Sequence, residues 1–553
     1  MENAQNDQVR AQLISTLWSL KSAITSHPNA IKGLGYVHFN TLIKDEDYRL
    51  SILKAAVESP VDEVRNIGQT ALDIHIPGPL SKNPNEAAAH YNDSSQSKPT
   101  AVNQDSADNK QPLPSTKRRT SLWLRSVVLF LVFGGMTSAA ISGWLWHSDT
   151  KIIEGSINES ANWQADKRYI LNGLVFVESG ATLSIEAGTR ISGSPGSALI
   201  VTRDAKINAQ GRSNAPIVFT SQQAEGERQS GDWGGLVLLG NAPINSGTAH
   251  IEGIKSDDPR GGYGGMADTG SCGVLKYVRV EFAGYEISQD NELNGLTLGG
   301  CGSGTIINHV QVHKGLDDGV EVFGGTVNLK HILISHPGDD GLDWDKGWQG
   351  KAQFVIVHQG PDTGDNGIEA DNDKNNHHAT PRSNPTLSNI SIVGSGHSNM
   401  AQRGLLLRRG TGGDFRNFLV TGFTTEALDL GDEATASLTL SNQLTATGWV
   451  IQHPEKRYFS DELGSKDDDN GFSEQVWLNT ASNLFTQLEV LNAKTSAAEI
   501  IPNFAPRSES AAALTHVPLP QNEFWDEGAN YAGAIRPGDR VSWLDGWTAY
   551  PVH

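Results

Sequence analysis

The sequence predicts a mainly β protein whose largest part is a right-handed parallel β-helix, joined to a small N-terminal α-helical domain and one transmembrane helix. Three observations indicate this fold class. Apolar, strand-like runs and Gly-containing turns alternate at intervals of 22–26 residues, the chain holds 59 Gly but only 4 Met, and its charged fraction is 19%. Short strands at a fixed period, without helical spacing, are typical of a solenoid in which each repeat covers the apolar edge of its neighbour.

The repeat is clearest over residues 309–373. Gly319 and Gly341 are 22 residues apart, and Gly367 follows 26 residues later. An acidic residue stands two positions after each of these glycines, namely Glu321, Asp343 and Glu369. Units of this length favour the right-handed parallel β-helix over the left-handed hexapeptide kind, and equivalent side chains on stacked rungs are then expected about 4.8 Å apart.

Residues 1–78 are predicted to form a small cytosolic helical domain. Apolar residues recur at helical spacing over residues 8–25, 45–58 and 60–74. The segment has no metal-ligand spacing and no phosphate-binding loop, so we expect it to bind an unknown cytosolic protein partner, with a mere structural plug as the alternative. Residues 79–121 are rich in Ser, Asn, Asp, Gln, Lys and Pro and are predicted to be a disordered linker.

Residues 122–147 are predicted to be the transmembrane helix. The 21 residues 126–146 carry no charge, which is long enough to cross a bilayer. By the positive-inside rule, the chain is a single-pass inner membrane protein with a cytoplasmic N-terminus and a periplasmic C-terminal domain. The basic residues that set this orientation are Lys117, Arg118, Arg119 and Arg125.

Small residues on the predicted membrane helix could bring two copies together. Gly135, Ala139 and Gly143 recur at every fourth position, a spacing that allows close helix packing and hence a homodimer. Small residues are also common in membrane helices that do not pair, so both readings stay open.

Residues 148–450 are predicted to form the β-helix, and residues 451–553, in which the repeat fades, a C-terminal cap over its open end. The formal net charge of -20 argues against nucleic acid as a partner, because phosphates demand a basic surface. The two cysteines, Cys272 and Cys301, both follow the predicted membrane segment, and such a pair outside the cytosol predicts a disulfide. Two buried free thiols are the alternative.

Stacked carboxylates repel one another, so protonation, basic neighbours or a bound cation must relieve the repulsion. Oxygen-only ligands suit a hard cation, and Ca²⁺ is the expected cofactor. The segment 371–375 has the D-x-D-x-N spacing that opens a calcium loop, although the twelfth position is Arg382 rather than Glu. The alternative is a ladder of turns in which Asp and Asn bond their own backbone. The predicted metal ligands are Asp318, Glu321, Asp340, Asp343, Glu369, Asp371 and Asp373.

Aromatic and histidine residues in the same region were weighed as ligand contacts. Trp344 and Trp348 flank the acidic turn and could stack on a sugar ring, or could cover the apolar core instead. The five histidines show no shared spacing, so we expect exposed strand or turn residues rather than a transition-metal site; they are His309, His313, His331, His336 and His358.

Five segments carry a resemblance to a known family: residues 294–300, 317–328, 338–348, 531–534 and 546–548. In these motifs the chain resembles the secreted bacterial pectin-lyase-like parallel β-helix proteins, a family of no established activity, over about residues 152–553. The resemblance implies the β-helix fold and residence outside the cytoplasm. Relatives are exported by a leader, whereas this chain has a predicted cytosolic domain and anchor.

We therefore expect a non-enzymatic protein that binds or scaffolds at the bacterial envelope, with a polysaccharide as ligand and calcium as a stabilising ion. The alternative is a polysaccharide hydrolase or lyase, for which no catalytic residue is assigned. An inverting hydrolase needs two carboxyls about 6.5–9.5 Å apart, which Asp317, Asp318, Asp339 and Asp340 could supply. A lyase needs a basic proton acceptor, for which the candidates are Lys314, Lys346, Arg403, Arg408 and Arg409.

Overall fold

The structure is a computed structural model in which the chain forms two compact units, Met1–Ser148 and Asp149–His553. It describes single positions between 9 and 42 and then residues 46–77, 150–288, 291–396, 402–455, 458–459, 468–480, 482–491, 502–513, 517–539 and 541–551. Residues 79–121 and 122–147, the predicted linker and transmembrane helix, lie outside the described residues and stay predictions. Within the described part, no helix is both long and apolar enough to cross a membrane.

The N-terminal unit contains the helices α3 (Glu46–Val57) and α4 (Asp62–Asp73), which agree with two of the helices expected from apolar spacing. Their apolar faces meet in a core that includes Leu53 and Val64. Arg49 is fully buried in this unit, and backbone carbonyls accept hydrogen bonds from its charged side chain. Its guanidinium donates to the oxygens of Leu42 at 2.8 Å and Ile76 at 3.1 Å.

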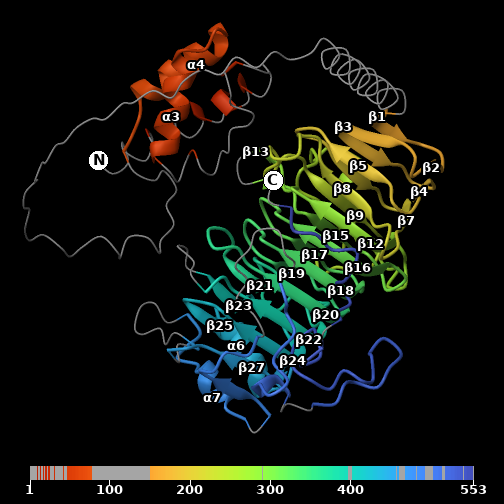
Figure 1. Cartoon of the computed structure of the whole chain (residues 1–553), viewed down its shortest axis with the longest axis vertical. Coiled ribbons are helices and arrows are strands. Elements are labelled where there is room, and N and C mark those ends of the chain that lie inside the picture. The colour runs from red at the N-terminus through yellow and green to blue at the C-terminus, as the bar shows by residue number, and fades with distance from the viewer. Residues whose placement is uncertain are drawn as a thin grey trace, which may run out of the picture. The chain divides into compact units, whose positions relative to one another are not determined.

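The second unit is a parallel β-helix, as predicted, whose strands follow one another along the stack in Figure 1. The pairing registers divide it into three parallel ladders, here called sheets I, II and III in the order in which one turn of the chain visits them. Every strand pair in these ladders is parallel. The right-handed sense of the coil stays a prediction.

Sheet I is made of short strands together with the second halves of β1 and β3. Its strands are β6 (Ala198–Val201), β9 (Gly235–Leu239), β15 (Leu296–Gly299), β17 (Val320–Phe323), β19 (Leu342–Asp345), β21 (Asn366–Ala370), β23 (Arg403–Leu407) and β25 (Glu426–Leu430).

Long strands bend at the corners and so belong to two sheets. Two of them run from sheet III into sheet I: β1 (Thr150–Ile157) and β3 (Arg168–Val177). Six run from sheet II into sheet III: β12 (Gly273–Glu281), β16 (Ile306–His313), β18 (Asn328–Ser335), β20 (Lys351–His358), β22 (Thr386–Val393) and β24 (Gly413–Thr421).

Short strands complete the other two sheets. Those of sheet II are β2 (Ala161–Trp163), β4 (Thr182–Ile185), β7 (Lys206–Gln210) and β26 (Leu444–Thr447). Those of sheet III are β5 (Arg190–Gly193), β8 (Ile217–Ser221), β27 (Val450–Gln452) and β28 (Leu484–Thr486).

The core fills the inside of the coil because strand alternation turns every second side chain inward. One inward column in sheet III shows the packing: its members are buried, branched or aromatic, and lie in register on five successive rungs. They are Val310, Ile332, Val355, Ile390 and Phe418.

The repeated glycines are explained by close contact with this core. A Cβ atom on Gly319 would lie 2.2 Å from the Ile334 side chain, and one on Gly341 would lie 2.4 Å from Val357. Gly367 meets Ile392 at 2.2 Å in the same way. A larger residue at these turns would therefore push the connection off the end of sheet III.

The corner between sheets II and III corrects the reading of the histidines. His309 and His331 occupy equivalent positions, 22 residues apart, and both adopt positive φ, as Tyr277 before them and Phe354 after them do. Their rings stack, with His309 and His331 centroids 4.3 Å apart. The expectation of unrelated, exposed positions was wrong, and His313 and His358 are also buried.

Two additions cover the outer faces of the coil. An insertion between β9 and β12 carries β10 (Ala249–His250), η2 (Pro259–Gly261) and β11 (Gly262–Tyr263) and packs Ile244, Ile251 and Tyr263 on the early rungs of sheet I. A small hairpin, β13 (Glu286–Ser288) with β14 (Asn291–Glu292), precedes β15.

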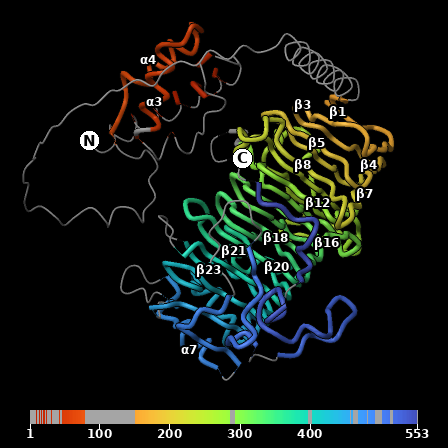
Figure 2. The backbone as a smooth tube through the Cα atoms, in the orientation of Figure 1, coloured from red at the N-terminus to blue at the C-terminus, as the bar shows by residue number. Residues whose placement is uncertain are grey.

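The C-terminal part differs from the predicted cap. The helices α6 (Glu433–Leu440) and α7 (Glu474–Leu478) contact the last strands, but residues 502–551, with η4 (Ala511–Ala513), run back along the side of the coil, as the blue tube in Figure 2 shows. Tyr550 and Phe504 pack in the cluster that covers the outer face of sheet III. Ala549 N donates to Gln311 Oε1 at 2.9 Å, across 238 residues.

Candidate functional site

The candidate site begins with an acidic column on the outer face of sheet I. Glu321 of β17 lies opposite Asp343 of β19, which lies opposite Glu369 of β21. The prediction that these three residues occupy the same place in the repeat is therefore confirmed. Thr297 precedes the column in β15 and Leu406 follows it in β23, so the acidic stretch spans three rungs.

The aspartates in the connections that lead into sheet I lie beside this column. Asp318 and Asp340 are buried and join successive connections, because Asp318 Oδ1 accepts from Asp340 N at 2.9 Å and Asp340 Oδ1 accepts from Asn366 N at 2.6 Å. Asn366 Nδ2 also donates to Asp340 Oδ1, at 2.9 Å. Asp340 thus bonds the backbone of the next rung, whereas the turn-ladder alternative expected a bond to its own turn.

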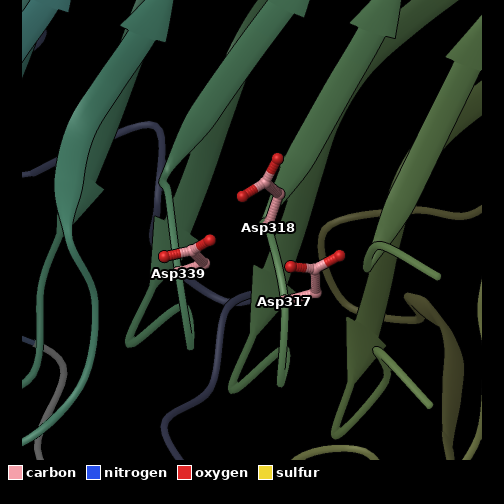
Figure 3. A group of neighbouring side chains, drawn as sticks. All are labelled: Asp317, Asp318 and Asp339. Atoms are coloured by element: carbon pink, nitrogen blue, oxygen red, sulfur yellow. The ribbon is translucent and has the colours of Figure 1, made fainter. Parts of the chain in front are cut away.

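Two groups of carboxylates come close enough to share a cation. Oxygen atoms of Asp317, Asp318 and Asp339 lie within 4.8 Å of one another, and so do those of Asp318, Glu321 and Asp343. Figure 3 shows the first group, with Asp317 and Asp318 on one connection and Asp339 on the next. Asp318 belongs to both groups, so the five residues form one continuous cluster that we call the acidic cluster. It could hold a metal ion.

Without a counter-charge, the carboxylates of the acidic cluster repel one another. Burial, reinforced by Asp343 and other carboxylates, raises the pKa of Glu321 well above its usual range. Burial and Glu369 likewise raise the pKa of Asp343, although Arg408 opposes the shift. Glu321 accepts a hydrogen bond from Asn294 Nδ2, whereas Asp343 Oδ1 is buried without a hydrogen-bond partner among the described residues.

The remaining predicted metal ligands lie beside cations instead. Arg408 binds Glu369 and also donates to Asp371 Oδ1 at 3.0 Å, and Arg409 contacts the other oxygen of Asp371. Burial raises the pKa of Glu369 to about 7 even though Arg408 lowers it. Glu369 and Asp371 therefore lie outside the two groups that could share a cation, although Glu369 still lies opposite Asp343.

The segment 371–375 does not have the form of a calcium loop. Asp373 Oδ1 accepts from the backbone N of Asn375 at 2.9 Å and of Asn376 at 2.8 Å, and its other oxygen is 3.7 Å from Lys346 Nζ. Asn372 points to the backbone and accepts from Ser383 N at 2.8 Å. These oxygens already have partners, as expected of turn residues.

The prediction that Trp344 and Trp348 stack on a glycan is wrong. Both side chains have an exposed fraction of 0% and belong to the core inside the coil. Their ring nitrogens are satisfied internally, by Thr411 Oγ1 at 3.1 Å and by the carbonyl of Val327 at 3.0 Å. Because Asp343 faces outward in β19, strand alternation turns Trp344 inward.

Three of the five basic residues considered as lyase proton acceptors, Arg403, Lys346 and Arg408, are held as cations, whereas burial lowers the pKa of Lys314. Arg403 donates to Glu426 at 2.6 Å, and Lys346 lies 3.2 Å from Asp345. Burial lowers the pKa of Arg403 and Lys346, but the adjacent carboxylates outweigh it and the pKa of each is raised. Arg408 follows the same pattern through Glu369. A protonated side chain cannot accept a proton, so Arg403, Lys346 and Arg408 are poorly suited to act as the base of an elimination.

The predicted disulfide is confirmed. Cys272 and Cys301 are bonded, with their Cα atoms 5.8 Å apart and both side chains buried. The bond joins the chain just before β12 to the chain just after β15, and so fixes the point at which the insertion rejoins the coil.

Two members of the acidic cluster, Asp317 and Asp339, were not among the predicted metal ligands, although the Asp-Asp-Gly repeat could have identified them. Asn294 was also missed, because its contact with Glu321 spans 27 residues and depends on the stacking register.

Comparison with known families agrees with this architecture. The model of a family described as a pectate-lyase-like β-helix domain matches residues 155–494. No curated protein and no solved structure matches the chain.

Proposed function

Since the chain belongs to the pectate-lyase-like β-helix domain family, we propose that it is a calcium-dependent polysaccharide-binding protein of the bacterial envelope. Binding takes place on the outer face of sheet I, beyond the part that the insertion covers. Calcium sits in the acidic cluster and links its carboxylates to acidic groups of the polysaccharide.

The observation that carries this proposal is the approach of Asp318, Glu321 and Asp343 to within 4.8 Å on two adjacent rungs. Their combined negative charge would repel an acidic glycan unless a cation lay between them. Oxygen-only ligands of this kind suit Ca²⁺, which accepts six to eight oxygens in flexible geometry. The free Oδ1 of Asp343 offers a ligand atom that no protein donor occupies.

Binding is favoured over catalysis by the state of the charged groups. The oxygens of Asp317 and Asp339 come within 4.8 Å, closer than the about 6.5–9.5 Å at which an inverting hydrolase holds its water. Asp318 and Glu321 are buried, with exposed fractions of 7% and 8%, so neither reaches a scissile bond on the surface. Three of the five candidate bases, Arg403, Lys346 and Arg408, are held as cations, as described above.

The envelope location rests on the apolar segment 126–146 and on the basic residues that precede it. The disulfide supports it, because such bonds persist outside the reducing cytosol. In this arrangement residues 1–78 face the cytosol and bind a partner there, and the membrane helix allows a homodimer. The β-helix unit lies in the periplasm.

The test is a binding experiment with the full chain in non-ionic detergent. Calorimetric titration with Ca²⁺ should show binding that the double variant Glu321→Gln/Asp343→Asn loses and that the exposed control Asp166→Asn keeps. A panel of acidic polysaccharides, such as polygalacturonate and alginate, should then bind in calcium and not in chelator. If the parent binds neither Ca²⁺ nor any polysaccharide, the proposal fails, and if it shortens a polysaccharide the lyase or hydrolase alternative replaces it.

A further inference from the structure

The first rungs of sheet III hold a second site of opposite charge. The C-terminal segment covers the outer face of sheet III on the later rungs, where it packs on Leu333, Ile356 and Val450. It leaves the rungs of β1, β3 and β5 open, and a cavity of about 280 Å³ lies there. The lining includes three arginines, Arg168, Arg190 and Arg228.

The arginines come together because of the repeat and one loop. Arg168 of β3 and Arg190 of β5 lie opposite each other in the parallel register, as Ile170 and Ser192 do two positions further on. Equivalent side chains on adjacent rungs lie about 4.8 Å apart. Arg228 comes from the loop that follows β8, and Val218 of β8 continues the column of Arg168 and Arg190.

Arg190 is the central residue, and in the described part of the chain its guanidinium makes no hydrogen bond or ion pair. Burial lowers the pKa of Arg190, and Arg228 and Arg168 lower it further, whereas Glu281 raises it. The Glu281 carboxylate is itself bound by Arg279 Nε at 2.9 Å. Arg190 is therefore a cation that lies among cations, with its nearest carboxylate already in use.

The hydrogen bonds of the other polar groups in the cavity determine which donors remain for a ligand. The Ser221 hydroxyl donates to Asp232 at 2.5 Å and accepts from Gln223 N, so it is not available to a ligand. Arg228 Nε donates to the Gln223 carbonyl at 3.2 Å, which anchors the loop and leaves the terminal nitrogens of Arg228 for the cavity. The available donors are thus chiefly guanidinium groups.

Three guanidinium groups suit a phosphate better than a carboxylate. A carboxylate carries only one charge, which a single bidentate arginine already balances. A phosphate monoester carries about -1.5 to -2 charges at neutral pH and three acceptor oxygens. Guanidinium forks also match phosphate geometry. In a chain of net charge -20, such a cluster of cations on one face stands out and suits an anionic ligand.

We propose that this cavity, the arginine pocket, binds a phosphate group, and that the source is the headgroup of an anionic membrane lipid. The lipid source follows from position along the chain. Thr150 lines the cavity and lies four residues after the predicted membrane segment 126–146, a stretch that spans at most about 14 Å when fully extended. The arginine pocket is then within reach of the bilayer surface, on a different sheet from the acidic cluster.

The test titrates the full chain in non-ionic detergent with two probes by calorimetry: inorganic phosphate and dihexanoylphosphatidic acid, a lipid whose headgroup is a phosphate monoester. Both should bind, and Arg190→Gln and Arg228→Gln should each weaken binding at least tenfold, whereas the exposed control Arg212→Gln should not change it. Because Arg228 lies in a loop, Arg228→Gln still tests the pocket if the strand variant Arg190→Gln fails to fold.

The outcomes distinguish a lipid headgroup from free phosphate as the source of the bound phosphate group. Tighter binding of the lipid than of phosphate supports the headgroup, and equal binding supports the arginine pocket with free phosphate as its ligand. Absence of binding by both probes overturns the proposal, as does binding that survives both pocket variants. Binding of galacturonate without binding of phosphate also overturns it, and would make the pocket an acidic-glycan site.

Discussion

Replacing Asp343 by Asn is expected to stabilise the protein without calcium and to destabilise it with calcium. Oxygens of Asp343 and Glu321 lie within 4.8 Å of one another. Two unit charges at that distance repel by about 3.5 kcal/mol at an effective dielectric constant of about 20. Asn removes one of the charges, keeps the shape, and places an amide beside Glu321.

The size of the effect depends on pH, and its sign follows from the raised pKa values. A carboxyl whose pKa is higher in the folded than in the unfolded protein binds its proton more tightly when folded, so its contribution to stability is lost as pH rises. Burial raises the pKa of both Glu321 and Asp343. In chelator at pH 8, the variant should therefore have a free energy of unfolding about 1–3 kcal/mol higher than the parent. Near pH 4 the two should converge.

With calcium bound, the parent should become more stable than the Asp343→Asn variant. A ligand at one thousand times its Kd stabilises the folded state by about 4.1 kcal/mol, which exceeds the advantage of the variant in chelator. The variant has one carboxylate ligand fewer and gains less from calcium. The assay is urea unfolding of the full chain, followed by the far-ultraviolet circular dichroism of the β-helix, in chelator and in calcium, with Asp166→Asn as control. The reasoning is refuted if the variant is less stable than the parent in chelator at pH 8.

Four further predictions concern other parts of the molecule. Trp344→Ala should lower the free energy of unfolding by about 3–5 kcal/mol because it empties a fully buried site, whereas Trp344→Phe should cost less; urea unfolding measures both. Reduction of the disulfide, which closes a 29-residue separation, should cost about 3–4 kcal/mol in the same assay, and no change would contradict it. Burial lowers the pKa of His331 and His358 to about 3, so stability should fall as pH drops below about 6.5, where the unfolded imidazoles bind protons first. Limited proteolysis at pH 5 should then cut the C-terminal segment faster than at pH 7, and His331→Gln should reduce the difference. Protease added to spheroplasts should digest the β-helix unit and spare the N-terminal unit, and the opposite pattern would contradict the proposed topology.

Local periodicity was enough to predict the coil and part of the candidate site. The 22-residue interval between Gly319 and Gly341 placed Glu321 over Asp343, because a parallel β-helix of constant rung length puts residues one repeat apart in register. The same interval separates His309 from His331 and Arg168 from Arg190, so both pairs could have been predicted from the sequence. Alternation around Asp343 could also have placed Trp344 in the core, although the sequence also left stacking on a sugar open.

Only the tertiary structure showed which segments cover the coil, which cations pair with the carboxylates, and which residues outside the repeat complete the two sites. Ala549 meets Gln311 across 238 residues, and Arg228 reaches the arginine pocket from a loop outside the repeat. Whether a carboxylate is free, like Asp343 Oδ1, or paired, like Asp371, depends on which arginine folds over it. Periodicity describes only the contacts that one rung makes with the next. Segments outside the repeat find their places through packing and charge, which no local spacing in the chain records.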